Sequence, residues 1–66
     1  MKLSVNGEPQ DAVGPLSVDG LVDELRLERR GLAIAVNGEV VPRSTWGGYD
    51  LVEGDQVEIL TIAQGG

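Results

Sequence analysis

Cysteine and histidine are both absent from the 66 residues of this chain. Without them the chain has no thiol nucleophile, no imidazole base and none of the usual zinc ligands. Its serine and threonine hydroxyls have no imidazole to activate them. We therefore predict that the chain is not an enzyme, that it has no catalytic residue, and that it binds no metal or cofactor of its own.

Long hydrophobic runs are also missing. No stretch approaches the roughly 18 consecutive apolar residues typical of a membrane-spanning helix, so we expect no membrane partner. The first residues lack the apolar segment and cleavage site of a secretion signal. Because no disulfide can form without cysteine, the cytoplasm is the expected compartment.

Positive charge is scarce. Five Lys and Arg residues stand against eleven Asp and Glu residues, which gives a net charge of −6. A domain of this charge repels phosphate backbones, so we predict no nucleic-acid partner. The same field attracts a basic protein surface, or it serves only to keep the domain soluble.

The distribution of apolar residues predicts one small α+β domain with a mixed sheet around one helix. The segments that read as strands are 2–6, 9–13, 32–36, 40–41 and 56–62. Two Asn-Gly pairs predict tight hairpin turns. A helical crossover allows the first and last strands to be adjacent and parallel in the middle of the sheet. Trp46, one of two aromatic residues, is expected to pack in the core.

One helix is expected near residues 18–26. Ser17 fits an N-cap, and apolar residues follow at the spacing of one helix face: Val18, Leu21, Val22 and Leu25. Gly31 is the predicted stop signal. The arginines between residues 26 and 30 would then lie toward the C-terminal end, where the helix dipole favours cations.

Two features suggest a surface for a partner. Leu60 and Ile62 alternate with Val57 and Ile59, so they are exposed if the helix covers the other face, and an exposed apolar patch is typical of an interaction site. The alternative is that Ile62 folds back over a sheet edge. Arg43 is either an ordinary surface residue or a cation that pairs with a partner.

Three stretches together carry a family resemblance. The runs "AVNGEVVPRSTW" and "LVEGDQVEIL" and the final Gly65-Gly66 resemble the sulfur carrier proteins of thiamin biosynthesis, a ubiquitin-like β-grasp family. The similarity covers nearly the whole chain. The small subunit of molybdopterin synthase shares the Gly-Asp turn and the terminal glycines. The run Val41-Pro42-Arg43-x-x-Trp46 resembles the thiamin family more.

The resemblance implies a domain and a tail. It implies a β-grasp domain at 1–62, with four to five strands packed on one main helix, and a flexible tail at 63–66. In this family the carboxylate of the last glycine, here Gly66, is adenylated and converted to a thiocarboxylate. The residues implied to thread the partners' active sites are Gly65, Gln64 and Ala63.

The resemblance also implies the partners. A ubiquitin-activating-type adenylating enzyme uses ATP to activate the tail. A cysteine desulfurase or another persulfide donor supplies sulfur, and thiazole synthase receives it to build the thiazole ring of thiamin. The free protein is expected to be a monomer.

Two other functions remain open at this point. The chain resembles carriers that serve other pathways, such as molybdopterin synthesis. A protein modifier would use the same Gly-Gly end to form an isopeptide bond with a target lysine, although a single lysine, Lys2, makes chains of the protein on itself a poor prospect.

Overall fold

The computed structural model describes residues 1–62. Within this range it contains five strands, one α-helix and one 3-10 helix. In chain order these are β1 (Lys2–Val5), β2 (Glu8–Asp11), α1 (Val18–Glu24), β3 (Leu32–Val36), β4 (Glu39–Val40), η1 (Arg43–Gly48) and β5 (Gln56–Thr61).

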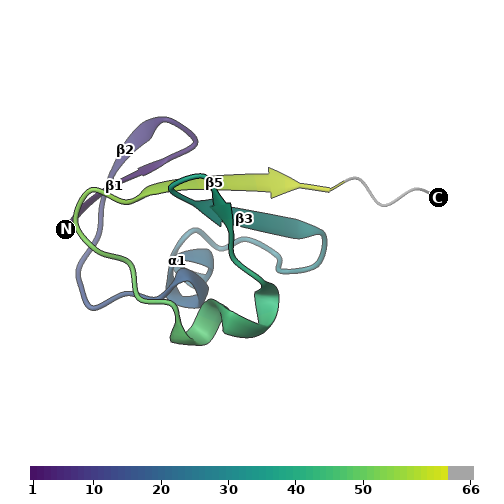
Figure 1. The fold of residues 1–66 in the computed structure, drawn as a ribbon. Helices are drawn as coiled ribbons and strands as arrows, with labels where there is room; N and C mark the ends of the chain where they lie inside the picture. The colour runs from purple at the N-terminus through teal and green to yellow at the C-terminus, as the bar shows by residue number, and fades with distance from the viewer. Residues whose placement is uncertain (63–66) are drawn as a thin grey trace.

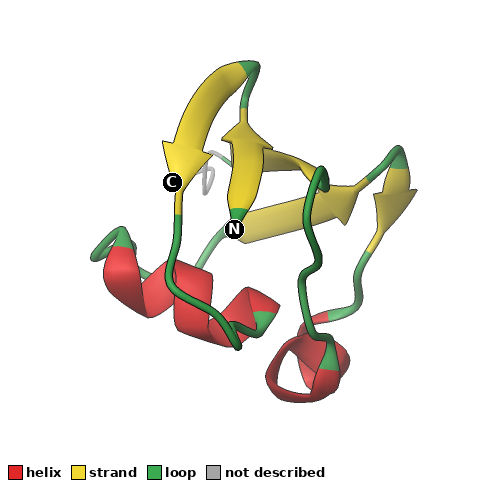
Figure 2. Ribbon diagram, turned by 90° about the vertical axis from the view of Figure 1, so that its left-hand side faces the viewer, coloured by secondary structure: helices red, strands yellow, loops and turns green. Residues whose placement is uncertain are grey.

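The five strands form one mixed sheet in the order β2-β1-β5-β3-β4. The first and last strands, β1 and β5, are parallel neighbours in its interior, and the other pairs are antiparallel. Figure 1 shows α1 lying across one face of the sheet, and Figure 2 shows η1 on the same side. The predicted α+β architecture and its central parallel pair are therefore confirmed.

The start of α1 follows the sequence prediction. The Ser17 hydroxyl oxygen accepts a hydrogen bond from the Gly20 backbone N–H at 3.0 Å, which satisfies one of the donors left free at a helix start. The residues that α1 buries against the sheet are Val18, Leu21 and Val22.

The end of α1 differs from the prediction. The helix stops before Arg26, whose φ of 56° is in the left-handed region. The Leu27 N–H bonds to the Val22 carbonyl and the Arg26 N–H to the Asp23 carbonyl, the pattern of a Schellman motif. Gly31, predicted as the stop, instead lies in the loop before β3. Arg26 takes the left-handed position after the helix, where a glycine is usual. The prediction based on Gly31 therefore placed the stop signal too late in the sequence.

The core between the sheet and the two helices is almost entirely aliphatic. Its largest fully buried members are Trp46, Leu21, Ile34, Val18, Val22, Val36 and Val57. The Trp46 indole N–H donates to the Val41 carbonyl at 2.8 Å, so its polar group is satisfied inside the core. Neither helix in residues 1–62 has the length and apolar character needed to cross a membrane.

Candidate functional site

The predicted reactive tail follows directly from β5. The four tail residues, Ala63, Gln64, Gly65 and Gly66, lie outside the described part of the chain. The last described residue, Ile62, donates its backbone N–H to the Gly31 carbonyl at 2.6 Å. The loop before β3 therefore holds the chain beside the sheet at the point from which the tail continues. The candidate site consists of this end of β5 and the surfaces around it (Figure 1).

An apolar patch lies on the open face of the sheet, which the helices do not cover. Leu60 is 68% exposed and Ile62 is 54% exposed, as the alternation of β5 predicted. Ala33 lies opposite Leu60, and Val40, 75% exposed, lies opposite Ala35 in the next strand pair. We call these five residues the exit patch. Sequence reasoning missed Val40, although its alternation with a buried neighbour signals its outward position.

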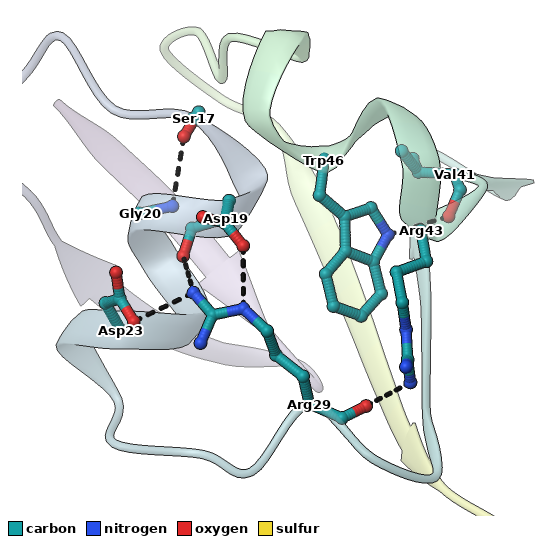
Figure 3. A network of polar contacts seen from close by, with 8 residues as sticks. All are labelled: Ser17, Asp19, Gly20, Asp23, Arg29, Val41, Arg43 and Trp46. Atoms are coloured by element: carbon teal, nitrogen blue, oxygen red, sulfur yellow. Dashed lines mark hydrogen bonds and ion pairs between the residues drawn. The ribbon is translucent and has the colours of Figure 1, made fainter.

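Arg43 is tied into the domain through two contacts. Its guanidinium lies over the Trp46 ring, 5.5 Å from the centroid, and its Nη2 donates to the Arg29 carbonyl. The same carbonyl accepts the Leu32 N–H at 3.2 Å. Arg43 therefore joins η1 to the loop that also holds Ile62 (Figure 3). Its role in binding a partner stays a prediction.

The Arg29 side chain lies along α1 and reaches back to its first turn. The expectation that this arginine lies toward the C-terminal end of the helix is therefore wrong. Its Nε donates to Asp19 and its Nη2 to Asp23, both at 2.8 Å (Figure 3). These hydrogen bonds, first to Asp19 and then to Asp23, raise the pKa of the Arg29 guanidinium above its ordinary value. Because the side chains are substantially exposed, the ion pairs orient the loop more than they stabilise the fold.

The described residues do not assemble a metal centre. Within 1–62, no three His, Cys, Asp or Glu residues are placed to hold a metal ion. An open depression of about 700 Å³ lies over β1 and β5, and Glu58 is the single titratable side chain that lines it. This depression therefore offers no acid–base pair.

Known proteins share both the sequence pattern and the fold of this chain. Residues 3–66 match the ThiS family. The chain belongs to that family. A crystal structure of a thiamine biosynthesis protein, ThiS, from Geobacter metallireducens matches the whole of this chain with 33% sequence identity and a TM-score of 0.86. The predicted resemblance to the thiamin sulfur carriers, and with it the β-grasp fold, is confirmed.

Other relatives of this ThiS-family chain include both short and long proteins. The sulfur carrier protein ThiS of Escherichia coli is 27% identical over the full length of both chains. A thiazole synthase of Paramagnetospirillum magneticum is 35% identical over 66 residues, which are all of this chain and 20% of that relative. The chain thus spans about a fifth of the length of the thiazole synthases that it matches.

Proposed function

We propose that this protein is the sulfur carrier of thiamin thiazole synthesis, with the carboxylate of Gly66 as the group that carries sulfur. The observation that carries the proposal is the match of residues 3–66 to the ThiS family, which extends to Gly66. The fold supports it, because β5, which precedes the tail in the sequence, is held between β1 and β3 in the sheet. The chain is a carrier and co-substrate in this scheme, and its partners supply the catalysis.

The chemistry begins with activation. A carboxylate is a poor electrophile, so one Gly66 oxygen first attacks the α-phosphorus of ATP on the adenylating enzyme and pyrophosphate leaves. The terminal sulfur of a persulfide donor then attacks the carbonyl carbon of the acyl adenylate, and AMP leaves. A thiol reduces the remaining sulfur–sulfur bond and becomes oxidised to a disulfide, which leaves the thiocarboxylate on Gly66.

Three classes of partner follow from this scheme. They are an adenylating enzyme of the ubiquitin-activating type, a cysteine desulfurase or other persulfide donor, and a thiazole synthase that takes the sulfur. The similarity to two thiazole synthases supports the last of these. ATP is bound by the activating partner and not by this chain. We place the reaction in the cytoplasm, where ATP and reducing thiols are both present.

The test is the mass of the intact protein. After incubation with the adenylating enzyme, ATP, a cysteine desulfurase, cysteine and a thiol, we expect a gain equal to the replacement of one oxygen by one sulfur. Fragmentation should place the change on Gly66. The mass of the protein from its own cells shows whether Gly66 is its last residue. Conjugates with lysines of other proteins, without any gain of sulfur, would favour a protein modifier. Sulfur passed to molybdopterin synthesis but not to thiazole synthase would favour the other carrier role.

The exit patch gives a second prediction, on binding. We expect Leu60→Asp or Ile62→Asp to weaken the complex with the adenylating enzyme by at least tenfold. A buried interface loses about 25 cal/mol for each Å² of apolar area removed, and a desolvated carboxylate adds a further cost. The measurement is titration calorimetry, with a melting curve for each variant.

The matched control for the patch is Val13→Asp. Val13 is exposed and apolar but lies in the loop after β2, away from the exit patch. We expect this variant to bind as the unmodified protein does. If the patch variants bind normally per folded molecule but melt much lower, Leu60 and Ile62 serve the fold and the patch is not an interface.

A further inference from the structure

The sequence contains the same four residues, Val-Asn-Gly-Glu, at two places. They are residues 5–8 and 36–39, and each forms the turn of a hairpin. In both turns the asparagine has a φ near 50°, Asn6 at 51° and Asn37 at 52°, followed by a glycine with positive φ. This is the backbone of a type I′ turn, and Asn-Gly is the pair that adopts it most readily. The turn alone would explain the repeat.

The side chains of the two asparagines do more than the turn requires. Both bond to the backbone of β5, from opposite sides. Asn6 approaches from β1, and Asn37 approaches from β3, the two neighbours of β5 in the sheet. The repeated sequence is therefore used twice to fix one strand, the strand that leads to the tail.

Asn6 extends the parallel ladder after β1 has turned away. Its backbone N–H donates to the Val57 carbonyl at 2.9 Å. Its side-chain oxygen then accepts the Ile59 N–H at 2.8 Å, and its side-chain NH₂ donates to the Ile59 carbonyl at 3.2 Å. A side-chain amide offers the same donor and acceptor as a peptide group. The Asn6 side chain thus occupies the place of the next peptide in the strand.

Asn37 contacts the other end of β5, and both its backbone and its side chain bond there to Gln56. Its backbone N–H donates to the Gln56 carbonyl at 2.8 Å, and its side-chain oxygen accepts the Gln56 N–H at 2.9 Å. Its NH₂ donates to the buried carboxylate of Asp55 at 2.9 Å. Asn37 therefore anchors the start of β5, whereas Asn6 acts close to the tail.

Asn6 makes the contact nearest the tail on its side of β5. In the part of the chain that the structure describes, no hydrogen bond on the β1 side of β5 lies beyond Ile59. After that point β5 is held by β3, which pairs with Thr61, and by the Gly31 carbonyl. Without the Asn6 side chain, the residues of β5 after Val57 would be hydrogen-bonded only on the side that faces β3.

From this geometry we propose that Asn6 is a positioning residue for sulfur transfer, resting on the proposed function of the tail. The Asn6 side chain bonds to both the backbone N–H and the backbone carbonyl of Ile59. We infer that these two bonds set the direction in which β5 leaves the sheet. The reacting carboxylate must reach a set position in a partner's active site, where a displacement of about 1 Å can cost about 100-fold in rate. A loosened strand end would spend less time in the productive direction.

The experiment compares Asn6→Gly with Asn37→Gly. Glycine keeps both turns, because it tolerates positive φ, and it removes only the side-chain amide. Each variant is assayed for melting temperature, for amide hydrogen exchange along β5, and for kcat and KM of thiocarboxylate formation with the adenylating enzyme, ATP and the sulfur donor.

For Asn6→Gly we expect exchange at Ile59 to rise about tenfold, as the loss of two hydrogen bonds would allow. We expect kcat to fall about tenfold or more, with KM nearly unchanged because the exit patch is intact. Asn37→Gly should lower the melting temperature at least as much, since it also removes a partner of Asp55, but it should leave kcat within about twofold. This contrast separates positioning from stability.

Two results would overturn the inference. One is an Asn6→Gly protein that forms thiocarboxylate at the unmodified rate, and the other is an equal loss of kcat in Asn37→Gly. In both cases the proposed function survives, because the unmodified protein still gains sulfur. If the unmodified protein gains none, the proposed function itself fails, and the positioning role fails with it.

Discussion

Removal of Gly66, or addition of one residue after it, is expected to abolish the gain of sulfur while the domain stays folded. One further residue moves the carboxylate by about 3.3 Å, several times the displacement of about 1 Å that can cost about 100-fold in rate. Loss of Gly66 leaves the carboxylate short by the same length. We therefore expect no detectable thiocarboxylate under conditions in which the unmodified protein is fully converted.

Glycine itself matters at this position. In the proposed scheme the tail enters the active sites of at least two enzymes. A residue without a side chain needs the narrowest channel and tolerates backbone angles that other residues cannot adopt. A side chain at position 65 or 66 would have to be accommodated by every partner. On the proposed function, this gives a physical reason for a Gly-Gly pair at the reactive end.

The measurement is the intact mass after incubation, with a melting curve for each variant. The control is Val13→Asp, which changes an exposed residue in the loop after β2, keeps the whole tail, and should still gain sulfur. All the core residues and hydrogen bonds described above lie within 1–62, so the melting temperatures should agree closely. If a lengthened protein acquires sulfur at its new last residue, activation does not depend on the length of the tail and this prediction is wrong.

The architecture could be predicted because several local signals agree with one another. Alternation identified the inward faces of β3 and β5, the two Asn-Gly pairs identified the hairpins, and the serine before Val18 identified the start of α1. With a helical crossover between the first and last strands, few sheet topologies remain. The exposure of Leu60 and Ile62 followed from the same alternation.

Long-range side-chain contacts could not be predicted in the same way. The sequence marks Asn6 as a turn residue, and nothing local shows that its amide pairs with Ile59, 53 positions away. Arg29 bonds to Asp19 from a loop whose path depends on the left-handed backbone conformation of Arg26. Sequence propensity favours glycine for that conformation. Contacts of this kind depend on the assembled sheet, so they appear only in the structure.

The second large effect concerns the core. We expect Trp46→Ala to leave the domain largely unfolded at 37 °C. Trp46 is 2% exposed, and a large buried side chain replaced by alanine costs about 3–5 kcal/mol because a cavity remains. A domain of this size has a total stability of about 3–10 kcal/mol, at roughly 0.05–0.15 kcal/mol per residue. The free energy lost in Trp46→Ala is therefore comparable with the total free energy of unfolding of the domain.

Two further variants separate the contribution of the apolar volume of Trp46 from the contributions of its hydrogen bond and of the cation above its ring. Trp46→Phe keeps most of the apolar volume but leaves the Val41 carbonyl without its donor, at a cost of about 1–3 kcal/mol. Arg43→Ala removes the cation above the ring and its bond to the Arg29 carbonyl, and each of these contacts is worth about 1 kcal/mol. In a domain of this length, 1 kcal/mol shifts the melting temperature by about 4–8 °C.

Far-UV circular dichroism during heating and urea titration measures all three variants, because it does not depend on the tryptophan that two of them lack. The expected order of melting temperatures is unmodified protein, Arg43→Ala, Trp46→Phe, Trp46→Ala, with the last at least about 12 °C below the first, from about 3 kcal/mol at about 4 °C for each. A Trp46→Ala protein that melts within a few degrees of the unmodified one would mean that η1 can detach without unfolding the sheet and α1. The aliphatic residues between sheet and helix would then be sufficient to hold the fold, and Trp46 would serve the attachment of η1 alone.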